Sequence, residues 1–368
     1  MRILFDHQIF SLHQYGGIAR YFYELANHIA DTPEHEVEIF SPFYVNEYLS
    51  APNKVQPCGI KIPRLFGNGR YLAWGASTAL AYSILRTRRN IDIFHETYYS
   101  RLNCCPSSAK KIITVYDMIH EKFPEAAPWS VKTREAKAHA VMRADHVICI
   151  SENTRRDLVE LLHVPEEKTS VVYLGYSLTS KGIKKPSAKD RPYILYVGQR
   201  DGHKNFLSLL QAYADSALLR DRFSLVCFGG EQFSAYEREL IKAHGLMLDS
   251  VIHFSGGDDV LAGLYGAAAA FVYPSLYEGF GIPPLEAMSF GCPVVCSSSS
   301  SLPEVVGDAA ELFDPADVTE MRTSIELVVS SSERAQLLIE RGYERIKRFS
   351  WQNCARDTLD VYNKSLRG

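Results

Sequence analysis

The chain has 368 residues, of which 46% are hydrophobic and 23% charged, and its formal net charge at pH 7 is -3. This composition is ordinary for a globular protein, so it excludes a disordered chain, a coiled coil and a collagen-like repeat. The nearly neutral balance also argues against a dedicated nucleic-acid binder, which usually carries a large basic excess. At roughly 100–200 residues per domain, we expect two domains.

Short β-branched runs alternate with longer helical patterns in the first half of the chain. Strands are predicted at Arg2–Phe5, Val37–Phe40, Ile91–His95, Lys111–Tyr116, His146–Ile150 and Thr169–Tyr173. Helices are predicted at Ile18–Ala30, Tyr71–Arg86 and Val131–Arg143. Alternating β and α units imply a parallel sheet with helices on both faces.

A polar segment with glycine and proline, around residues 177–192, interrupts the pattern and is predicted to be a linker. Strands then resume at Tyr193–Val197, Ser224–Gly229, Val251–Phe254, Ala270–Tyr273 and Val294–Ser297. Helices are expected near Leu207–Ala217, Tyr236–His244 and Val260–Ala267, from Pro284 onward, and at Trp351–Leu366.

We therefore predict two doubly wound, Rossmann-like α/β domains that face a central cleft. They would span 1–178 and 193–348, joined by a linker at 179–192, with a terminal helix at 349–368 that returns to the N-terminal domain. Open α/β sheets bind ligands at the carboxyl ends of their strands, so the cleft is the expected site.

The eight cysteines show neither a CxxC pair nor a histidine at zinc spacing. The nearest arrangement, Cys292 to Cys296, is an apolar and β-prone run, which favours core packing over metal binding. No metal site is therefore expected. The N-terminus does not resemble a signal peptide, and no apolar run reaches the ~18 residues of a membrane span. These features favour the reducing cytoplasm.

The first motif is Tyr15-Gly16-Gly17-Ile18, between the first predicted strand and a helix. Glycines let backbone N–H groups approach a ligand, and the start of a helix favours an anion. The same glycines equally fit a tight turn without a ligand. The motif is not the GxGxxG fingerprint, so a nicotinamide enzyme is not favoured.

The second motif, Gly198–Asn205, follows the first strand of the second domain and places Arg200 and Lys204 in one loop. Two cations at the carboxyl end of a strand suit a diphosphate. Solvated surface charge is the alternative interpretation.

The third motif runs from Glu278 to Glu286 and follows the strand Ala270–Tyr273. Its two glycines permit an unusual loop, and its prolines suit the first turn of a helix, so loop and helix start predict an anion cradle. Glu278 before the helix and Glu286 in its first turn can both face the cleft, where carboxylates accept hydrogen bonds from sugar hydroxyls. Compensation of the helix dipole would explain Glu286 alone, but not the whole string.

Together these motifs resemble those of a known family. Seven residues separate Glu278 from Glu286, as in the E-x7-E signature of retaining glycosyltransferases with the GT-B fold, and Arg200 and Lys204 match that family's basic pair. Further matching pieces follow in order: Gly16-Gly17, Ser151-Glu152-Asn153-Thr154, Gly229-Gly230 and Leu302-Pro303-Glu304. Over its whole length the chain resembles glycosyltransferase family 4 (group 1).

The resemblance implies transfer of a sugar from a nucleotide diphosphate sugar, with retention at the anomeric carbon and without a metal or other cofactor. Arg200 and Lys204 would neutralise the diphosphate as the leaving group departs. Glu278 would bind the donor sugar, and Glu286 the ribose hydroxyls. Further donor contacts would come from Gly16, Gly17, Phe280, Gly281 and Ile282, and at the nucleobase from Val251–Gly256, with Phe254 and Ser255.

The chain departs from the resemblance at one place. Many relatives carry a histidine directly after the strand that here ends Ile113-Thr114-Val115, but this chain has Tyr116. Either His120 takes that histidine's place, with Asp117 three residues away on the same turn, or the role is dispensed with. In the plainer interpretation Asp117 caps a helix and His120 packs or faces solvent.

No acidic residue lies between Glu47 and Asp92, so residues 54–89 carry a charge of +7 among aromatic and leucine side chains. Such a face suits an anionic membrane surface or a lipid-linked saccharide. A helix packed on the sheet with solvated arginines would give the same pattern. The basic residues are Lys54, Lys61, Arg64, Arg70, Arg86, Arg88 and Arg89.

The sequence thus predicts a GT-B glycosyltransferase that builds a surface polysaccharide or glycolipid in the cytoplasm, or at the inner face of the plasma membrane. Its partners would be a nucleotide-sugar donor and a saccharide or lipid-linked saccharide acceptor, with no nucleic acid. The branch of the family that the chain resembles favours GDP-mannose or a related GDP-sugar as the donor, and a UDP-sugar is the second choice. A sugar-nucleotide epimerase of GT-B architecture and a non-catalytic sugar-nucleotide-binding scaffold are the alternatives, and the intact Glu278, Arg200, Lys204 and Glu286 weigh against both.

Overall fold

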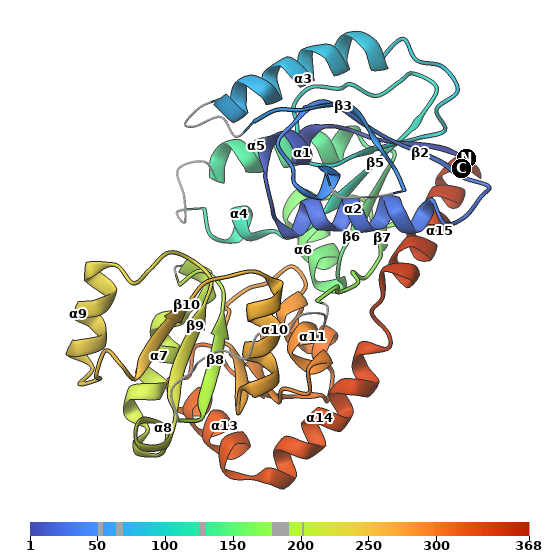
Figure 1. Ribbon diagram of the computed structural model, residues 1–368. Coiled ribbons are helices and arrows are strands. Elements are labelled where there is room, and N and C mark those ends of the chain that lie inside the picture. Colours follow the sequence, from blue (N-terminus) through green and yellow to red (C-terminus); the bar gives the residue numbers. More distant parts are fainter. Residues whose placement is uncertain (51–53, 64–68, 125–129, 179–190, 201, 368) are drawn as a thin grey trace. The chain divides into compact units, whose positions relative to one another are not determined.

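The computed structural model describes residues 1–50, 54–63, 69–124, 130–178, 191–200 and 202–367 (Figure 1). The chain forms two compact units, one of Met1–Gly175 with Trp351–Gly368 and one of Tyr176–Ser350. Most of the predicted linker at 179–192 lies outside the described residues. Each unit is built on one parallel sheet, which confirms the predicted doubly wound α/β class.

The sheet of the N-terminal unit has its parallel strands in the order β3-β2-β1-β4-β5-β6-β7. The middle strands are almost entirely buried, as expected for a parallel sheet with both faces covered. The strands are β1 (Arg2–Phe5), β2 (Glu36–Tyr44), β3 (Pro57–Lys61), β4 (Ile93–Glu96), β5 (Lys110–Val115), β6 (His146–Cys149) and β7 (Thr169–Val171).

Helices of this unit connect the strands in sequence. They are α1 (Gln8–Leu12), α2 (Gly17–Ile29), α3 (Gly69–Leu85), α4 (Ile119–Lys122), α5 (Ser130–Arg143) and α6 (Glu152–Leu162), with 3-10 turns at Tyr48–Ser50 and Glu166–Lys168. Ser151 caps α6, because its side chain accepts a hydrogen bond from the backbone N–H of Thr154 at 3.0 Å.

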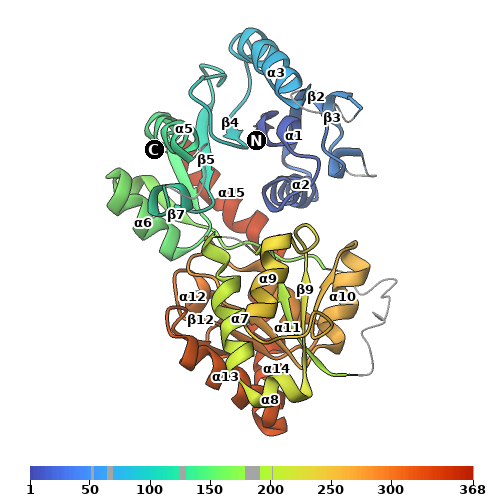
Figure 2. The same ribbon diagram turned by 90° about the vertical axis from the view of Figure 1, so that its left-hand side faces the viewer.

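The last helix, α15 (Trp351–Arg367), belongs to the N-terminal unit and packs against α2 (Figures 1 and 2). Its buried face carries Trp351, Cys354, Val361 and Tyr362. The hydroxyl of Tyr362 lies 2.6 Å from Nδ1 of His95 on β4, so the end of the chain is joined to the middle of the first sheet.

The sheet of the C-terminal unit has the order β10-β9-β8-β11-β12-β13, again all parallel. The strands are β8 (Tyr193–Val197), β9 (Ser224–Phe228), β10 (Val251–Phe254), β11 (Ala270–Tyr273), β12 (Val294–Ser297) and β13 (Ala310–Phe313). The helices are α7 (Phe206–Asp215), α8 (Ala217–Arg222), α9 (Ala235–Ala243), α10 (Asp258–Ala267), α11 (Ile282–Ser289), α12 (Leu302–Val306), α13 (Val318–Ser330) and α14 (Ser332–Ile346), with a 3-10 turn at Gly202–Lys204.

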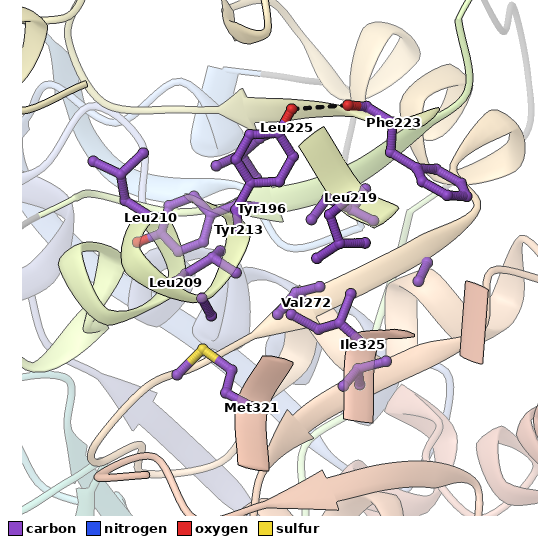
Figure 3. Packing of buried hydrophobic residues seen from close by; sticks show 14 of the residues in the cluster. Tyr196, Leu209, Leu210, Tyr213, Leu219, Phe223, Leu225, Val272, Met321 and Ile325 are labelled. Atoms are coloured by element: carbon purple, nitrogen blue, oxygen red, sulfur yellow. Dashed lines mark hydrogen bonds between the residues drawn. The ribbon is translucent and has the colours of Figure 1, made fainter. Parts of the chain in front are cut away.

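The core of this unit lies between the sheet and helices α7, α8 and α13 (Figure 3). Tyr213 of α7 is fully buried there, and its hydroxyl donates to the carbonyl oxygen of Phe223 at 2.8 Å, which satisfies the one polar atom of the ring. Met321 and Ile325 of α13 are also buried in this cluster. Burial of each such side chain stabilises the fold by about 1.5–3 kcal/mol.

Candidate functional site

The sheet of the C-terminal unit changes winding direction between β8 and β11. Strands β9 and β10 follow β8 on one side, and β12 and β13 follow β11 on the other. Doubly wound sheets bind ligands at such a switch point, outside the carboxyl ends of the strands. The loops at this point are the two that carry the second and third sequence motifs, after β8 and after β11.

Lys204 and Glu278 meet at the switch point. Nζ of Lys204 lies 2.6 Å from Oε1 of Glu278 and 3.4 Å from the hydroxyl of Tyr273 at the end of β11. Glu278 is 8% exposed. Burial by itself would raise the pKa of Glu278, but the charge of Lys204, together with the nearby hydroxyls of Ser275 and Tyr273, holds that pKa below its ordinary value. The site therefore holds a buried, ionised carboxylate beside an ammonium group.

Three consecutive serines hold the loop that carries Glu278. The hydroxyl of Ser299 donates to the carbonyl oxygen of Leu276 at 2.8 Å, and that of Ser300 accepts from the backbone N–H of Glu278 at 2.9 Å. The hydroxyl of Ser301 lies 2.9 Å from the carbonyl oxygen of Glu278 and 2.7 Å from that of Phe280. We call these three residues, Ser299–Ser301, the serine clamp.

The predicted backbone cradle lies at the start of α11. Phe280 is buried, with its ring 5.7 Å from that of Phe349, so its side chain serves the core and only its backbone is available to a ligand. Gly281 has a φ of 124°, and a Cβ there would lie 2.8 Å from Leu302, so only glycine fits. Ile282 is the first residue of α11.

Glu286 does not lie in the first turn of α11, which corrects the sequence-based expectation. The helix begins at Ile282 rather than Pro284, because both prolines are accommodated within the first turn, and no acidic residue lies there. Glu286 is therefore one turn further along, where dipole compensation is weak. It is 7% exposed, and burial together with the neighbouring Glu286 carboxylate raises the pKa of Tyr265.

Arg200 and Lys204 share a loop, but the structure gives their side chains different partners. Nε of Arg200 lies 2.6 Å from Oε1 of Glu237, and Nη1 and Nη2 donate to the carbonyl oxygens of Gly229 and Glu231. Its guanidinium also lies 4.7 Å from the ring centroid of Phe233.

Arg200 borders a cavity of about 660 Å³ within the C-terminal unit. Gly230, Ser234 and Glu237 line the same cavity, whereas Lys204 and Glu278 do not. Of the basic pair, Arg200 thus lines this cavity, while Lys204 pairs with Glu278.

The segment predicted to hold a nucleobase follows β10. Phe254 is the last residue of this strand, and its carbonyl oxygen accepts a hydrogen bond from Gly229 at 3.2 Å. Ser255 and the two glycines after it are exposed. The segment thus presents backbone groups at the same sheet edge as the loops after β8 and β11.

In the N-terminal unit, Gly16 and Gly17 form the start of α2. Gly16 is the N-cap with a φ of 150°, and a Cβ added at either glycine would meet nothing within 4 Å. Both glycines are exposed, so the turn leaves open space beside a helix N-terminus.

Tyr116, at the position where the family resemblance has a histidine, is buried and donates its hydroxyl to the carbonyl oxygen of Thr97 at 3.0 Å. The carboxylate of Asp117 accepts from the backbone N–H of Ile119 at 3.1 Å, at the start of the short helix α4. His120 is half-buried, and Nδ1 lies 3.4 Å from the hydroxyl of Ser130.

Fully buried Lys137 fixes this turn. Its Nζ donates to the carbonyl oxygen of Asp117 at 2.8 Å and lies 2.7 Å from Oε2 of Glu121. Burial and the charge of Lys137 lower the pKa of His120, while Asp117 and Glu121 oppose that shift. His120 is thus a partly accessible imidazole close to a carboxylate, on the side of the sheet where the strands end.

Comparison with known proteins identifies the family. The model for "Glycosyltransferase Family 4" matches residues 15–180, and that for "Glycosyl transferases group 1" matches residues 180–345. The O-antigen chain mannosyltransferase B of Escherichia coli is 30% identical over 94% of this chain and 95% of its own length. The chain belongs to glycosyltransferase family 4.

Other relatives in the family agree with this assignment. The MMP alpha-(1->4)-mannosyltransferase of Mycolicibacterium hassiacum is 30% identical over 63% of this chain and 57% of its own length. Among solved structures, sucrose-phosphate synthase from Thermosynechococcus elongatus (20% identity, TM-score 0.73) covers 99% of this chain and 98% of its own. HepE from Anabaena in complex with UDP and glucose (16% identity, TM-score 0.73) covers 98% of this chain and 99% of its own. These likenesses confirm the GT-B fold.

The sequence of this family 4 glycosyltransferase does not reveal the partners that hold its motif residues. Tyr273 and Ser275 lie next to Glu278, and Glu237 pairs with Arg200. The capping box Ser234–Glu237 at the start of α9 gives a signal for that helix, but no pattern connects it to Arg200. The serine run 297–301 is visible in the sequence, although its hydrogen bonds are not.

The remaining expectations concern metal and membrane. Within the described ranges, no group of three or more His, Cys, Asp or Glu side chains is placed to hold a metal ion. Cys292 and Cys296 are buried free thiols, as core packing predicts. In the part of the chain that the structure describes, no helix is long and apolar enough to cross a bilayer.

Proposed function

We propose that this family 4 glycosyltransferase moves a mannosyl residue from GDP-mannose, or a related GDP-sugar, to a saccharide or lipid-linked saccharide during synthesis of a surface polysaccharide or glycolipid. The buried Lys204–Glu278 pair at the switch point carries the proposal, because it places a cation 2.6 Å from the first carboxylate of the signature motif. The O-antigen chain mannosyltransferase, similar over nearly its whole length, supports the choice of sugar.

The proposed chemistry retains the anomeric configuration and uses no metal. The bond between C1 of the sugar and the oxygen of the β-phosphate breaks, and the acceptor hydroxyl oxygen bonds to C1 from the same face. The acceptor proton passes to the departing phosphate oxygen. Lys204 and Arg200 supply the positive charge that offsets the growing negative charge of the leaving group. Arg200 can do this only through an N–H group of Nη1 or Nη2, because its Nε is paired with Glu237.

The other residues are proposed to bind and orient the donor. Glu278 accepts hydrogen bonds from the sugar hydroxyls, and backbone N–H groups at Phe280, Gly281 and Ile282 contact the donor where α11 begins. Glu286 holds the ribose, a role that its burial one turn into the helix supports. His120, near Asp117, is proposed to contact the transferred sugar in place of the family histidine.

The first experiment is a thermal-shift panel of GDP, UDP, ADP, TDP and CMP in the presence of EDTA. A nucleotide at 100 times its Kd stabilises a protein by about 2.7 kcal/mol, so the donor nucleotide gives a measurable shift. We expect GDP to give the largest shift, and Glu286→Ala to reduce it more than Glu278→Ala does. A UDP-specific shift would assign a UDP-sugar instead. No shift with any nucleotide would contradict a donor site at these loops and favour the scaffold alternative.

Turnover then separates a transferase from an epimerase or a scaffold. GDP-mannose incubated with the protein, EDTA and α-mannotriose is expected to release GDP and give an α-linked product, seen in the one-bond C1–H1 coupling by NMR. A β-linked product would exclude retention. Loss of activity in EDTA that returns with Mg²⁺ would exclude metal independence, and conversion of the donor without GDP release would point to the epimerase.

We also propose contact of α3 with an anionic membrane surface. Arg64 lies outside the described residues, as does the side chain of Arg70. Lys54, Lys61 and Arg88 form ion pairs within the unit, so the net positive charge of the patch is smaller than the sequence indicates. Apolar exposure supports the proposal instead, at Ile60, Tyr71, Leu72, Leu80, Tyr82 and Ile84.

One face of α3 nevertheless packs on the sheet, with Ala81 and Leu85 fully buried, as the plainer interpretation predicts. The opposite face would lie against the bilayer. In sedimentation with phosphatidylglycerol vesicles at low salt, the protein is expected to appear in the vesicle pellet. Leu72→Glu is expected to reduce the fraction that is bound. A protein that stays in the supernatant at low salt contradicts membrane contact.

A further inference from the structure

A cluster of aromatic side chains lies on the surface of the N-terminal unit, and none of its members has a role so far. We call Tyr15, Arg20, Tyr23 and Tyr48 the tyrosine shelf. Tyr15 lies in the loop between α1 and α2. Arg20 and Tyr23 lie on α2 three residues apart, and Tyr48 begins the 3-10 turn after β2.

The shelf has a defined geometry. The ring centroids of Tyr15 and Tyr48 are 5.9 Å apart with planes at 84°, and those of Tyr23 and Tyr48 are 5.8 Å apart at 33°. The guanidinium carbon of Arg20 lies 5.6 Å from the centroid of the Tyr48 ring. Tyr48 is therefore the centre of the cluster, and Tyr15 stands at a right angle to it.

A buried amide joins the segment that carries Tyr15 to the segment that carries Tyr48. Asn46 is fully buried, and its Nδ2 donates to the carbonyl oxygens of His13 at 2.8 Å and Gln14 at 3.3 Å. Its Oδ1 accepts from the backbone N–H of Tyr48 at 3.1 Å. The loop before α2 and the turn after β2 are thus fixed to each other, so the shelf keeps its geometry without a ligand.

The exposure of Tyr15 points to recognition, because the other three residues of the shelf are half-buried and hold it in place. Tyr15 leaves 61% of its surface exposed, although burial of its ring would be favourable. The nearly perpendicular rings of Tyr15 and Tyr48 form a corner. The ring face of Tyr15 lines it, and the phenolic hydroxyls and the Arg20 guanidinium lie at its border. A pyranose is complementary to that corner, because it has an apolar C–H face surrounded by hydroxyls. Tyrosine and arginine also dominate binding energy at recognition surfaces, since each offers a rigid contact plane with polar atoms at its end.

We propose that the tyrosine shelf binds a pyranose residue of the acceptor saccharide, an assignment that rests on the transfer reaction proposed above. Tyr15 stacks on the C–H face of the sugar, and Arg20 and the hydroxyl of Tyr48 bond to its hydroxyls. Tyr15 directly precedes Gly16 and Gly17, so a sugar on the shelf lies beside the open turn at the start of α2.

The test is direct binding of α-mannotriose and, as a second probe, maltotriose to the full-length protein, measured by saturation-transfer NMR and titration calorimetry. Tyr15→Ala is expected to weaken the binding of the recognised probe roughly 3- to 10-fold, as for loss of one aromatic contact. Arg20→Ala should weaken it by a similar factor. Tyr343→Ala on α14 is the matched control, because Tyr343 is 45% exposed and lies in the other unit. Binding of neither probe by the wild type overturns the proposal, as does unchanged affinity in Tyr15→Ala.

Failure of the shelf and failure of the proposed function give different results. Both the shelf and the proposed function are supported if GDP still raises the Tm of Tyr15→Ala while the KM for α-mannotriose rises and the KM for the donor is unchanged. A normal GDP shift with saccharide binding that does not respond to Tyr15→Ala or Arg20→Ala overturns the shelf alone. Shelf-dependent saccharide binding without any nucleotide shift keeps the shelf and overturns the donor chemistry. Tyr48→Phe, which keeps the ring and removes the hydroxyl, is expected to weaken binding while the fold is retained in circular dichroism.

Discussion

The chemistry of Glu278 depends on the ammonium group beside it. A carboxylate that is 8% exposed is ionised here because Lys204 lies 2.6 Å away and Tyr273 and Ser275 are close. Removal of the lysine leaves a buried charge without its cation, which is a large electrostatic penalty. Its pKa must then rise, since burial is the largest influence on it and acts in that direction.

Lys204→Met is therefore expected to lower turnover by roughly 100-fold or more, through loss of leaving-group stabilisation. It should also move the acidic limb of the pH–rate profile to higher pH, because the pKa of Glu278 is no longer held down. Steady-state kinetics between pH 4.5 and 8 would show both effects. Lys242→Met is the matched control, because Lys242 forms an exposed ion pair with Glu239 on α9. Wild-type turnover in Lys204→Met would contradict the assignment of Lys204 to the diphosphate.

At the scale of elements, the loop after β11 keeps its shape through the serine clamp from the loop after β12. These loops belong to neighbouring parallel strands, so their carboxyl ends meet at one edge. Ser301 is fully buried and bonds to two carbonyl oxygens, of Glu278 and Phe280. Loss of its hydroxyl leaves both acceptors without that donor and lets the loop move.

We expect Ser301→Ala to lower turnover roughly 10- to 100-fold, because displacement of a reactive group by about 1 Å has an effect of that size. The free energy of unfolding should fall by about 1–3 kcal/mol. Ser298→Ala is a control within the same serine run. Ser298 is exposed, and its side chain makes no hydrogen bond to the residues that the structure describes. Kinetics and thermal unfolding of the two variants test the clamp. Equal behaviour of both variants would show that Ser301 does not position the loop.

The strands that the sequence predicts well are the short buried ones of the parallel sheet. β1 has the predicted bounds, and β4, β5 and β6 lie within two residues of the prediction, because each is a short β-branched run between turns. β3 escapes prediction, since Pro57 and Gly59 have low strand preference and the strand forms by pairing with β2 at the sheet edge. No element is predicted at 302–348, where α12, β13, α13 and α14 lie.

For the site, the sequence identifies Glu278, Lys204 and Gly281 through their order and spacing, but it cannot supply their partners. Glu237 reaches Arg200 from a helix that begins after β9, and the two residues are brought together by the parallel pairing of β8 and β9. The contacts of Arg200 with Gly229 and Glu231 arise in the same way. Such contacts depend on loop conformation and register, which residue spacing does not encode.

At the scale of the whole molecule, the first unit is completed by the end of the chain. His95 on β4 lies 2.9 Å from the hydroxyl of Thr114 on β5 through Nε2, and 2.6 Å from that of Tyr362 on α15 through Nδ1. It thus joins two strands to the terminal helix inside the core. Burial lowers the pKa of His95 to about 3, so the imidazole is neutral in the folded unit at ordinary pH.

This neutral histidine makes stability depend on pH. The unfolded chain takes up a proton near pH 6.5 but the folded unit only near pH 3, so His95 favours folding above pH 6.5 and this contribution falls as pH drops from 6.5 toward 3. The slope is about 1.4 kcal/mol per pH unit. His95→Gln should be less stable than the wild type at pH 7, and the difference should shrink by about that amount per unit between pH 6.5 and 4.5.

Urea unfolding followed by tryptophan fluorescence measures this unit alone, because Trp74, Trp129 and Trp351 all fall within its segments. His163→Asn is the control, since His163 is exposed at the end of α6 with a φ of 54° that asparagine tolerates. It shows what the replacement of an exposed histidine outside the core does to stability at each pH. A constant difference for His95→Gln would mean that His95 takes up a proton equally in both states, and that the terminal helix does not enclose a neutral histidine in solution.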